Sequence, residues 1–242
     1  MSAAAVIPCR LGSTRLPEKA LLRDTGKYLV QHVWERVKGA RRIARVIVAT
    51  DHPRIVEAVR SFSGEAVMTA PGHASGTDRV AEVARSLADE VIVNVQGDEP
   101  EIDAADLDLL VDALERDREC AIATLATPMR SDAELAAEST VKVVADAAGR
   151  ALYFSRSAIP RYARAGREPP EAFKHRGVYA FRRATLLELA RLPSPPVERL
   201  ERLEQLRWLH HGHRIRAVVT PRDGIGIDTP EDYRRFVQGA VR

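Results

Sequence analysis

Short apolar runs alternate with longer amphipathic stretches through the first half of the chain. Residues 3–7, 45–50, 66–68 and 91–95 are rich in Ala, Val and Ile and predict strands. Such continuous apolar runs indicate strands buried on both faces, as in a parallel sheet. Between them, residues 29–37, 77–87 and 104–114 have apolar positions at helical spacing, and Asp51 is expected to cap a further helix that carries Ile55, Val56 and Val59. The alternation predicts an α/β fold with a doubly wound, mostly parallel sheet.

The pattern changes in the second half. Residues 121–127, 141–145, 151–154 and 177–181 predict strands in quick succession, with a hairpin turn at 146–149. A helix is predicted over 198–211, where leucines recur at every third position from Leu200 to Leu209. A step of three residues is shorter than one helical turn, so successive leucines shift around the helix and make its apolar face broad. Such a helix is expected to be enclosed by the rest of the protein or to contact another subunit. A strand at 215–219 and a helix beginning at Pro230 follow.

Composition and charge narrow the class of protein. The 242 residues are 45% hydrophobic and 29% charged, which is ordinary for a soluble globular enzyme of one domain or one domain with a small lobe. The net charge is only +3 and the two signs are interspersed, so we do not expect a nucleic-acid partner. The two cysteines form no metal or disulfide pattern, and no stretch predicts a signal peptide or a membrane span. We therefore expect a cytoplasmic protein with no membrane partner.

The loop over residues 8–19 is the first candidate for chemistry. It follows the first predicted strand, and its prolines, Gly12 and hydroxyl residues such as Ser13 exclude regular structure. Three cations, Arg10, Arg15 and Lys19, lie close together in it. Like charges in one loop are stabilised by a bound anion, so the pattern favours phosphate binding, with a solvated basic loop as the alternative. The spacing matches neither a P-loop nor a Rossmann dinucleotide fingerprint.

Two later loops also follow predicted strands, where ligands bind in open α/β sheets. In residues 72–79, Ser75 and its neighbours supply donors at a helix N-terminus, although Ser75 is equally suited to cap that helix. In residues 96–100, Asp98 has the carboxylate that Mg²⁺ prefers, although Gly97 and Pro100 also suit a plain turn.

A second carboxylate stands near the end of the chain. Thr229 is suited to cap the last helix and Pro230 to begin it, while Glu231 and Asp232 favour its N-terminus through the helix dipole. Asp228 alone has no role in capping or beginning this helix. Together with Asp98 and the cationic loop, it predicts metal-assisted transfer from a nucleotide.

Polar residues in the second half are candidates for a second substrate. His175 and Tyr179 fall on one face of a predicted strand, although an exposed histidine or one satisfied in the core is the commoner case. Arg156 follows the strand at 151–154 and can hold a carboxylate. Glu204 and Gln205 lie within the apolar helix pattern and need polar partners, which sugar hydroxyls would supply.

Seven segments in this order resemble one family, the bacterial 3-deoxy-manno-octulosonate cytidylyltransferases (CMP-Kdo synthetases). They are residues 7–19, 75–79, 93–100, 151–156, 175–179, 203–207 and 228–232. The resemblance implies a single nucleotidyltransferase domain over 1–242, in which 1–120 mainly bind CTP, 121–215 mainly bind the sugar and dimerise, and 216–242 return to the core. It also implies a homodimer, a Mg²⁺ cofactor, and transfer of CMP from CTP to Kdo with release of pyrophosphate, for lipopolysaccharide synthesis.

The resemblance also implies roles for individual residues. The catalytic set would be Arg15, Lys19, Asp98 and Asp228, with both aspartates as magnesium ligands. CTP would be bound by Arg10, Ser13, Arg15, Lys19, Ser75 and Arg79. The sugar acid would be bound by Gln96, Arg156, His175, Tyr179, Glu204 and Gln205. Three departures stand out: Glu18 replaces a usual glycine, Cys9 replaces a common alanine, and residues 159–173 match poorly. The alternatives are another sugar acid, such as a sialic or 8-amino analogue, and a non-catalytic nucleotide-binding protein.

Overall fold

The chain folds into two compact units. The computed structural model describes residues 1–13, 15–161, 172–224 and 226–240. The first unit consists of Met1–Asp108 and Gly224–Arg242, and the second of Leu109–Asp223. Helix α4 (Ala104–Arg116) carries the chain from the first unit into the second. The single domain with segments 1–120, 121–215 and 216–242 stays a prediction. The division of labour between the segments stays a prediction.

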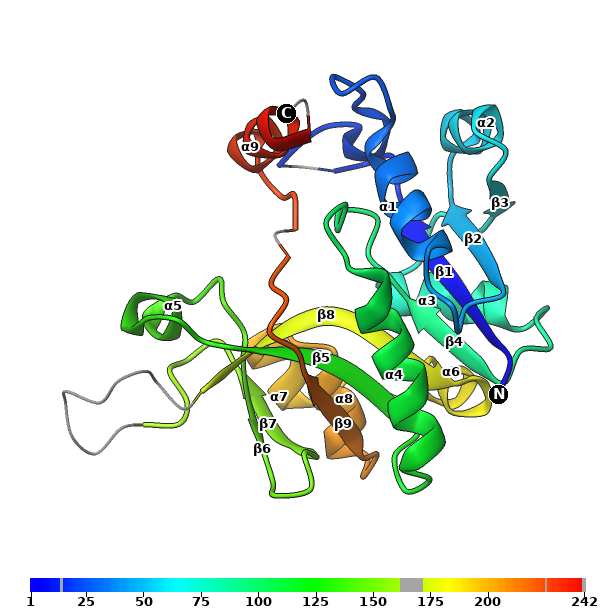
Figure 1. The fold of residues 1–242 in the computed structure, drawn as a ribbon. Helices are drawn as coiled ribbons and strands as arrows, with labels where there is room; N and C mark the ends of the chain where they lie inside the picture. Colours follow the sequence, from blue (N-terminus) through cyan, green and yellow to red (C-terminus); the bar gives the residue numbers. More distant parts are fainter. Residues whose placement is uncertain (14, 162–171, 225, 241–242) are drawn as a thin grey trace. The chain divides into compact units, whose positions relative to one another are not determined.

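The first unit is built on a parallel sheet. Its strands are β1 (Ala3–Cys9), β2 (Arg45–Thr50), β3 (Glu65–Met68) and β4 (Val91–Asn94). They lie in the order β3-β2-β1-β4, and every pairing is parallel (Figure 1). The chain winds outward from β1 to β3 and then returns to β4, so the predicted doubly wound α/β arrangement is confirmed. The order reverses between β1 and β4, and that switch point is where such sheets bind ligands.

Helices pack against these strands. They are α1 (Leu29–Lys38), α2 (Pro53–Ser61) and α3 (Gly76–Ala84), and a short 3-10 helix, η1 (Lys19–Leu21), follows the first loop. The expectation that Asp51 caps α2 is wrong. His52 is the capping residue, and its ring Nδ1 accepts the Arg54 N–H at 3.2 Å. Asp51 is used elsewhere, in an ion pair with Arg79.

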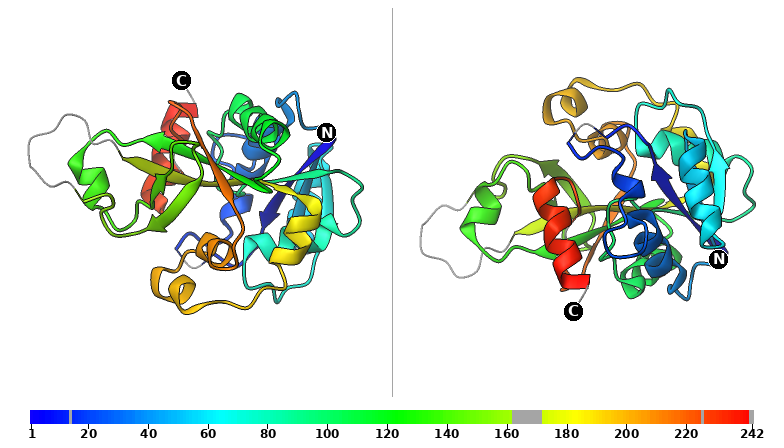
Figure 2. Two further views of the ribbon diagram at one scale, coloured as in Figure 1. Left: turned by 90° about the horizontal axis from the view of Figure 1, so that it is seen from below. Right: turned by 90° about the horizontal axis from the view of Figure 1, so that it is seen from above.

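The last helix, α9 (Pro230–Ala240), returns to the first unit and lies beside η1 and the loop before it (Figures 1 and 2). Leu16, Leu29, Ile227 and Tyr233 form a buried apolar cluster there. The Tyr233 hydroxyl also accepts the Asp24 N–H at 2.9 Å. As predicted, the Thr229 hydroxyl caps this helix by accepting the Asp232 N–H at 3.2 Å. The cluster holds the N-terminal loop and the segment before α9 together.

The second unit contains a mixed sheet. Strand β5 (Ile122–Pro128) pairs antiparallel with β8 (Phe173–Arg182) and parallel with β9 (Ile215–Val219). The predicted hairpin is confirmed: β6 (Lys142–Ala145) and β7 (Ala151–Ser155) pair antiparallel, and Gly149 in their turn has φ +75°. The helices of this unit are α5 (Asp132–Ala136), α6 (Arg183–Leu189), α7 (Pro196–Glu201) and α8 (Gln205–His210).

The single helix predicted over 198–211 is wrong. The chain forms α7 and α8 instead, separated at Arg202, whose φ of +54° is left-handed. The Leu203 N–H donates back to the Glu198 carbonyl, which closes α7 as in a Schellman cap. Leu200 is consequently 84% exposed, whereas Leu206 is buried. The regular spacing of the leucines predicted one continuous helix. The left-handed residue Arg202 interrupts that helix, so the later leucines do not continue the apolar face of α7.

No helix in the described part of the chain combines the length and the apolar character that crossing a membrane requires.

Candidate active site

A cavity opens in the first unit at the carboxyl ends of β1 and β4. Its volume is about 310 Å³. Three chain segments form its walls: the loop after β1, the loop that leads into α3, and the loop after β4, with one residue from the segment before α9. The lining residues are Pro8, Cys9, Arg10, Ser13, Arg15, Lys19, Ala20, His73, Ala74, Ser75, Gly76, Arg79, Gln96, Gly97, Asp98 and Asp228.

The structure brings together all the residues that the sequence pointed to in this unit. The six candidate CTP residues line the one cavity, and so do Gln96 and the two candidate magnesium ligands. The cavity lies where the strand order reverses, as expected for a doubly wound sheet.

Lys19 lies at the meeting point of the two aspartates. Its Nζ donates to Asp98 Oδ2 at 2.6 Å, to the Ile227 carbonyl at 2.8 Å and to Asp228 Oδ1 at 3.4 Å. Backbone pairing places the two acids, because the Ile227 N–H donates to the Asp98 carbonyl at 2.8 Å. Arg15 reaches Asp228 Oδ1 at 3.1 Å from an exposed position. The side chain of Lys19 is only 16% exposed, so its charge acts inside the cavity.

The two aspartates are also candidates for holding a magnesium ion. Two carboxylates that converge on one positive charge are hard oxygen ligands of the kind Mg²⁺ prefers. The described residues contain no group of three or more His, Cys, Asp or Glu that could hold a metal. Mg²⁺ usually binds through one or two carboxylates, with waters and substrate phosphates completing its shell, so Asp98 and Asp228 fit such an ion.

Arg79 lines the cavity but is already anchored. It is buried, its Nη2 pairs with Asp51 Oδ2 at 2.8 Å, and its Nη1 donates to the Thr69 hydroxyl. Asp51 Oδ1 also accepts the Leu11 N–H at 3.4 Å. The Arg79–Asp51 pair therefore ties α3 to the loop after β1, which fixes two walls of the cavity relative to each other.

Ser75 caps α3. Its hydroxyl accepts the Asp78 N–H at 3.1 Å, and Asp78 Oδ2 accepts the Ser75 N–H at 3.2 Å, which is a capping box. The capping alternative for Ser75 is therefore realised, while its place in the cavity wall keeps it within reach of a ligand.

Gly97 lies where the loop after β4 comes against the end of β1. A Cβ at this position would lie 2.4 Å from Cys9 Sγ and 3.2 Å from the Pro8 carbonyl. Glycine is therefore required for the loop after β4 to lie against the end of β1. The Cys9 thiol is buried, and burial raises its pKa to about 12, so it is not a nucleophile near neutral pH.

Glu18, the acid at a position where the resembling family usually has glycine, has φ +52°. This left-handed conformation favours glycine, which has no Cβ to clash. The Glu18 carboxylate turns to Arg54 in a two-point ion pair, with one contact of 2.8 Å, and the hydrogen bond from Arg54 lowers the pKa of Glu18. Glu18 is therefore directed at α2, and its charge is paired with a guanidinium.

Two substitutions at Glu18 separate the backbone from the ion pair. Glu18→Ala removes the pair and keeps the Cβ, whereas Glu18→Gly removes both. Both variants lack the ion pair with Arg54, and exposed ion pairs contribute little to stability. The difference in stability between the two variants therefore measures the cost of a Cβ in this left-handed conformation. We expect Glu18→Gly to melt about 2–4 °C above Glu18→Ala in thermal unfolding. Equal melting temperatures for the two variants would contradict a strained Glu18.

Two candidate sugar residues lie in an aromatic cluster of the second unit. The ring of His175 contacts those of Phe154 and Tyr179, at centroid distances of 5.0 and 5.4 Å, and Tyr179 contacts Trp208. The predicted shared face of His175 and Tyr179 is confirmed by this contact. His175 Nε2 lies 2.9 Å from the Thr124 hydroxyl. Burial lowers the pKa of His175 from 6.5 to about 3, so the ring is neutral near pH 7.

This shift makes stability depend on pH. Below pH 6.5 the unfolded chain binds a proton at His175 that the folded protein does not, so stability is intact above pH 6.5 and falls as the pH drops toward 3. Relative to pH 7.5, we expect this group alone to lower the free energy of unfolding by about 1 kcal/mol at pH 5.5. Urea unfolding of His175→Gln should lack this component, whereas the exposed-site variant His210→Gln should keep it. Parallel pH profiles for parent and His175→Gln would contradict the assignment.

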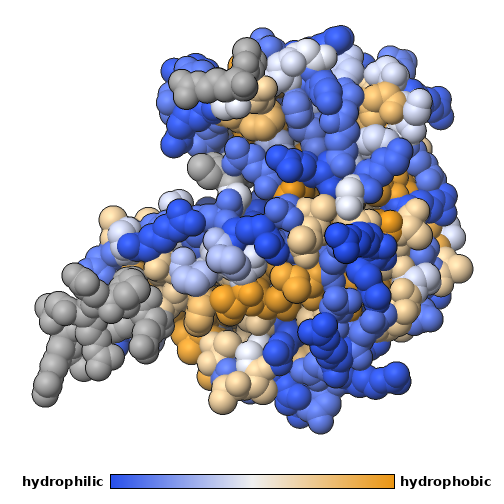
Figure 3. All heavy atoms as spheres, in the orientation of Figure 1, coloured by the Kyte–Doolittle hydropathy of each residue, from blue (hydrophilic) through white to orange (hydrophobic). Residues whose placement is uncertain are grey.

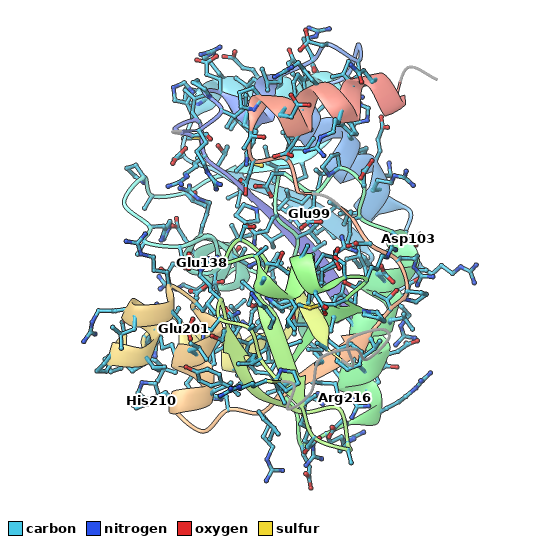
Figure 4. The ribbon with its side chains drawn as sticks, turned by 90° about the vertical axis from the view of Figure 1, so that its left-hand side faces the viewer. Glu99, Asp103, Glu138, Glu201, His210 and Arg216 are labelled. Atoms are coloured by element: carbon cyan, nitrogen blue, oxygen red, sulfur yellow. The ribbon has the colours of Figure 1, made fainter. Side chains whose placement is uncertain are left out.

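Arg156 is held mainly by backbone carbonyls. Its Nε donates to the Glu201 carbonyl and its Nη1 to the Glu138 carbonyl, both at 3.1 Å. Figure 4 shows Glu138 and Glu201 close together on one side of the second unit. The buried ammonium of Lys142 donates to three carbonyls, those of Ala137, Thr140 and Arg156 itself. Lys142 therefore holds the backbone at Arg156 in place. The sequence did not point to this lysine.

Glu204 and Gln205 lie at the start of α8. Gln205 is buried, and the negative charge of Glu204 contributes, after burial, to raising the pKa of Tyr179. The structure thus places these two residues near the aromatic cluster of the same unit. Their contacts with a sugar stay a prediction.

Known proteins are similar to this chain over most of its length. A family model described as "Cytidylyltransferase" matches residues 4–215. The 3-deoxy-manno-octulosonate cytidylyltransferase of Syntrophobacter fumaroxidans is 45% identical over 98% of this chain and 96% of its own length. That of Syntrophotalea carbinolica is 46% identical, over 97% of each chain.

Solved structures are also similar to this chain. The structure of a CMP:2-keto-3-deoxy-manno-octonic acid synthetase complexed with CTP has a TM-score of 0.93 and 43% identity, over 98% of both chains. A cytidylyltransferase from Leptospira borgpetersenii shares the fold, with a TM-score of 0.67 at 20% identity, over 98% of this chain and 85% of its own.

Proposed function

This chain belongs to the family of the 3-deoxy-manno-octulosonate cytidylyltransferases, and we propose that the cavity of its first unit is where it binds and cleaves CTP. The protein is a nucleotidyltransferase that transfers CMP from CTP to 3-deoxy-manno-octulosonate and releases pyrophosphate. One observation carries the proposal: the candidate phosphate cations and the two candidate magnesium ligands line one cavity at the switch point of the sheet.

The triphosphate is placed by charge. Arg10, Arg15 and Lys19 supply the positive charge of the cavity, and Ser13 supplies a hydroxyl donor. Asp98 and Asp228 would repel phosphate if they were uncompensated, and Lys19 already compensates them in part. When bound, a magnesium ion held by the two aspartates would supply further compensation of the charge on the phosphates.

The reaction needs positioning more than covalent catalysis. The anomeric hydroxyl of the sugar attacks the α-phosphorus of CTP in line, and pyrophosphate leaves from the opposite side. Lys19 and Arg15 offset the negative charge that builds on the phosphoryl oxygens as the bond to pyrophosphate breaks. The rigid walls set by the Arg79–Asp51 pair and by Gly97 keep the α-phosphate in place.

For the sugar acid, the proposal uses residues of the second unit. Arg156 is fixed through Nε and Nη1, and its Nη2 makes no hydrogen bond with the described part of the chain. That remaining donor is suited to the sugar carboxylate. The neutral ring of His175 and the polar ends of Tyr179, Glu204 and Gln205 are suited to hydroxyl groups.

We further propose that the second unit dimerises through β7. Within the part of the chain that the structure describes, β7 pairs with β6 alone, and Leu152 on β7 is 61% exposed. Figure 3 shows apolar surface around β7 and β9. An exposed apolar strand edge is suited to a second copy of the chain. Light scattering at micromolar concentration should give a dimer for the parent and a monomer for Leu152→Asp. A monomeric parent would overturn this assignment.

The function is tested by pyrophosphate release from CTP with a panel of sugar acids. We expect 3-deoxy-manno-octulosonate to be the preferred acceptor by kcat/KM over its 8-amino analogue and over sialic acids. Preference for another acid would revise the substrate. No release with any acid, while CTP still binds, would support a non-catalytic nucleotide-binding protein.

A further inference from the structure

His73 lines the same cavity, although the sequence did not point to it. It lies on the wall formed by residues 73–76 and Arg79, apart in sequence from the cationic loop after β1. Its side chain is 18% exposed, so a ligand can reach it.

The imidazole of His73 is oriented by Glu82 of α3. His73 Nε2 lies within hydrogen-bond distance of Glu82 Oε2. The carboxylate is itself fixed, because its Oε2 and Oε1 accept the Ala70 N–H at 3.1 and 3.3 Å. Burial opposes ionisation of Glu82, but the hydrogen bonds from His73 and Ala70 outweigh burial and lower its pKa. The carboxylate is therefore ionised near neutral pH.

This partner determines the tautomer of the ring. An ionised carboxylate only accepts hydrogen bonds, so Nε2 of His73 must carry the proton that lies between them. In the neutral imidazole, Nδ1 is then an acceptor. Nδ1 makes no hydrogen bond with the described part of the chain, so it is available to a ligand.

The walls of the cavity differ in charge. The loop after β1 contributes Arg10, Arg15 and Lys19, which suits the triphosphate. On the wall formed by residues 73–76 and Arg79, the one arginine or lysine among the described lining residues is Arg79, and Asp51 neutralises it. Among the described lining residues, the His73 wall is thus the less positive one, and it suits the neutral base of the nucleotide.

We propose that Nδ1 of His73 accepts a hydrogen bond from the 4-amino group of cytosine, and that Glu82 is the positioning residue that holds the ring in this state. The inference rests on the proposed function, since it assigns the base end of the same site. Uracil has an oxygen at this position. Two acceptors would then face each other, and UTP would be rejected.

Two substitutions at His73 test the roles of its two ring nitrogens separately. The Asn side chain places its amide near the position of Nδ1, whereas the Gln side chain places it near Nε2. His73→Gln keeps a partner for Glu82 and loses the acceptor that Nδ1 offers to the base. His73→Asn keeps an oxygen acceptor near Nδ1. The preference for CTP over UTP, as a ratio of kcat/KM values, should fall about tenfold to a hundredfold in His73→Gln and less in His73→Asn.

Glu82→Gln tests the positioning role. A glutamine amide can donate to Nε2 and favour the opposite tautomer, so the CTP preference should fall here too, through a higher KM for CTP with kcat little changed. Glu57→Gln is the matched control, an exposed carboxylate on α2 outside this cavity, and should keep the parent ratio.

The outcomes separate the two proposals. A parent that releases pyrophosphate from CTP but uses UTP equally well would overturn the His73 assignment and leave the proposed function standing. Unchanged preference in His73→Gln would do the same. A parent that releases no pyrophosphate from CTP would overturn the proposed function itself, and calorimetric binding of cytidine against uridine would then still test His73.

Discussion

Asp98→Asn and Asp228→Asn are each expected to lower kcat/KM by about 10²–10³-fold, and the double variant is expected to lose little more. The two carboxylates meet on one ammonium, that of Lys19, and are therefore expected to act as one unit in holding positive charge beside the phosphates. Once either is neutralised, the other cannot hold that charge alone. Both acids are partly exposed, so melting temperatures should change little.

The measurement is steady-state pyrophosphate release together with removal and return of the metal. EDTA should abolish activity in the parent, and Mg²⁺ should restore it fully in the parent but poorly in either variant. Glu231→Gln is the matched control, because Glu231 is an exposed acid three residues after Asp228 that pairs with Arg234 instead. Independent, multiplicative losses in the double variant, or full activity in EDTA, would remove the shared-metal proposal.

Lys19→Met is expected to lower kcat/KM by about 10³-fold. The substitution removes the most enclosed of the three cations in the loop after β1 and leaves Asp98 and Asp228 facing each other and the incoming triphosphate. CTP should therefore bind more weakly, and the phosphoryl charge should be less well compensated during transfer.

Lys27→Met is the control for this experiment, since Lys27 is an exposed lysine of the same unit that pairs with Glu35. It should retain parent activity. Arg15→Ala should also lose turnover, without a change in melting temperature, because Arg15 is 66% exposed. If Lys19→Met lowers only the melting temperature and keeps kcat/KM, the lysine is a structural tie between the two aspartates and not part of the reaction.

Long-range pairing explains why these roles needed the folded structure. Lys19 and Asp228 are 209 residues apart, and the distance between them is set by the Ile227–Asp98 backbone bond and by the packing of α9 on the N-terminal loop. The sequence placed each residue on a loop after a strand or before a helix. It did not show that the ammonium of Lys19 would lie between the two acids.

Local pattern also failed at particular residues. The leucine spacing from Leu200 to Leu209 suggested one helix, but the left-handed backbone at Arg202 divides it. Glu18 looked like an acid beside a phosphate site, and its pairing with Arg54 directs it elsewhere. His73 carried no signal, because a histidine acquires its role from the partner at Nε2, here Glu82 nine residues later.

The sequence by itself determined the α/β class, the hairpin at 146–149, and the loops that hold the candidate CTP and magnesium residues. It could do so because strand and helix periods are local, and because loops after parallel strands gather at one edge of a sheet. Only the tertiary structure decided which charges are paired, which atoms the close approach at Gly97 brings together, and which nitrogen of His73 is available. Those features depend on the order of the strands and on contacts between distant segments, which no local pattern contains.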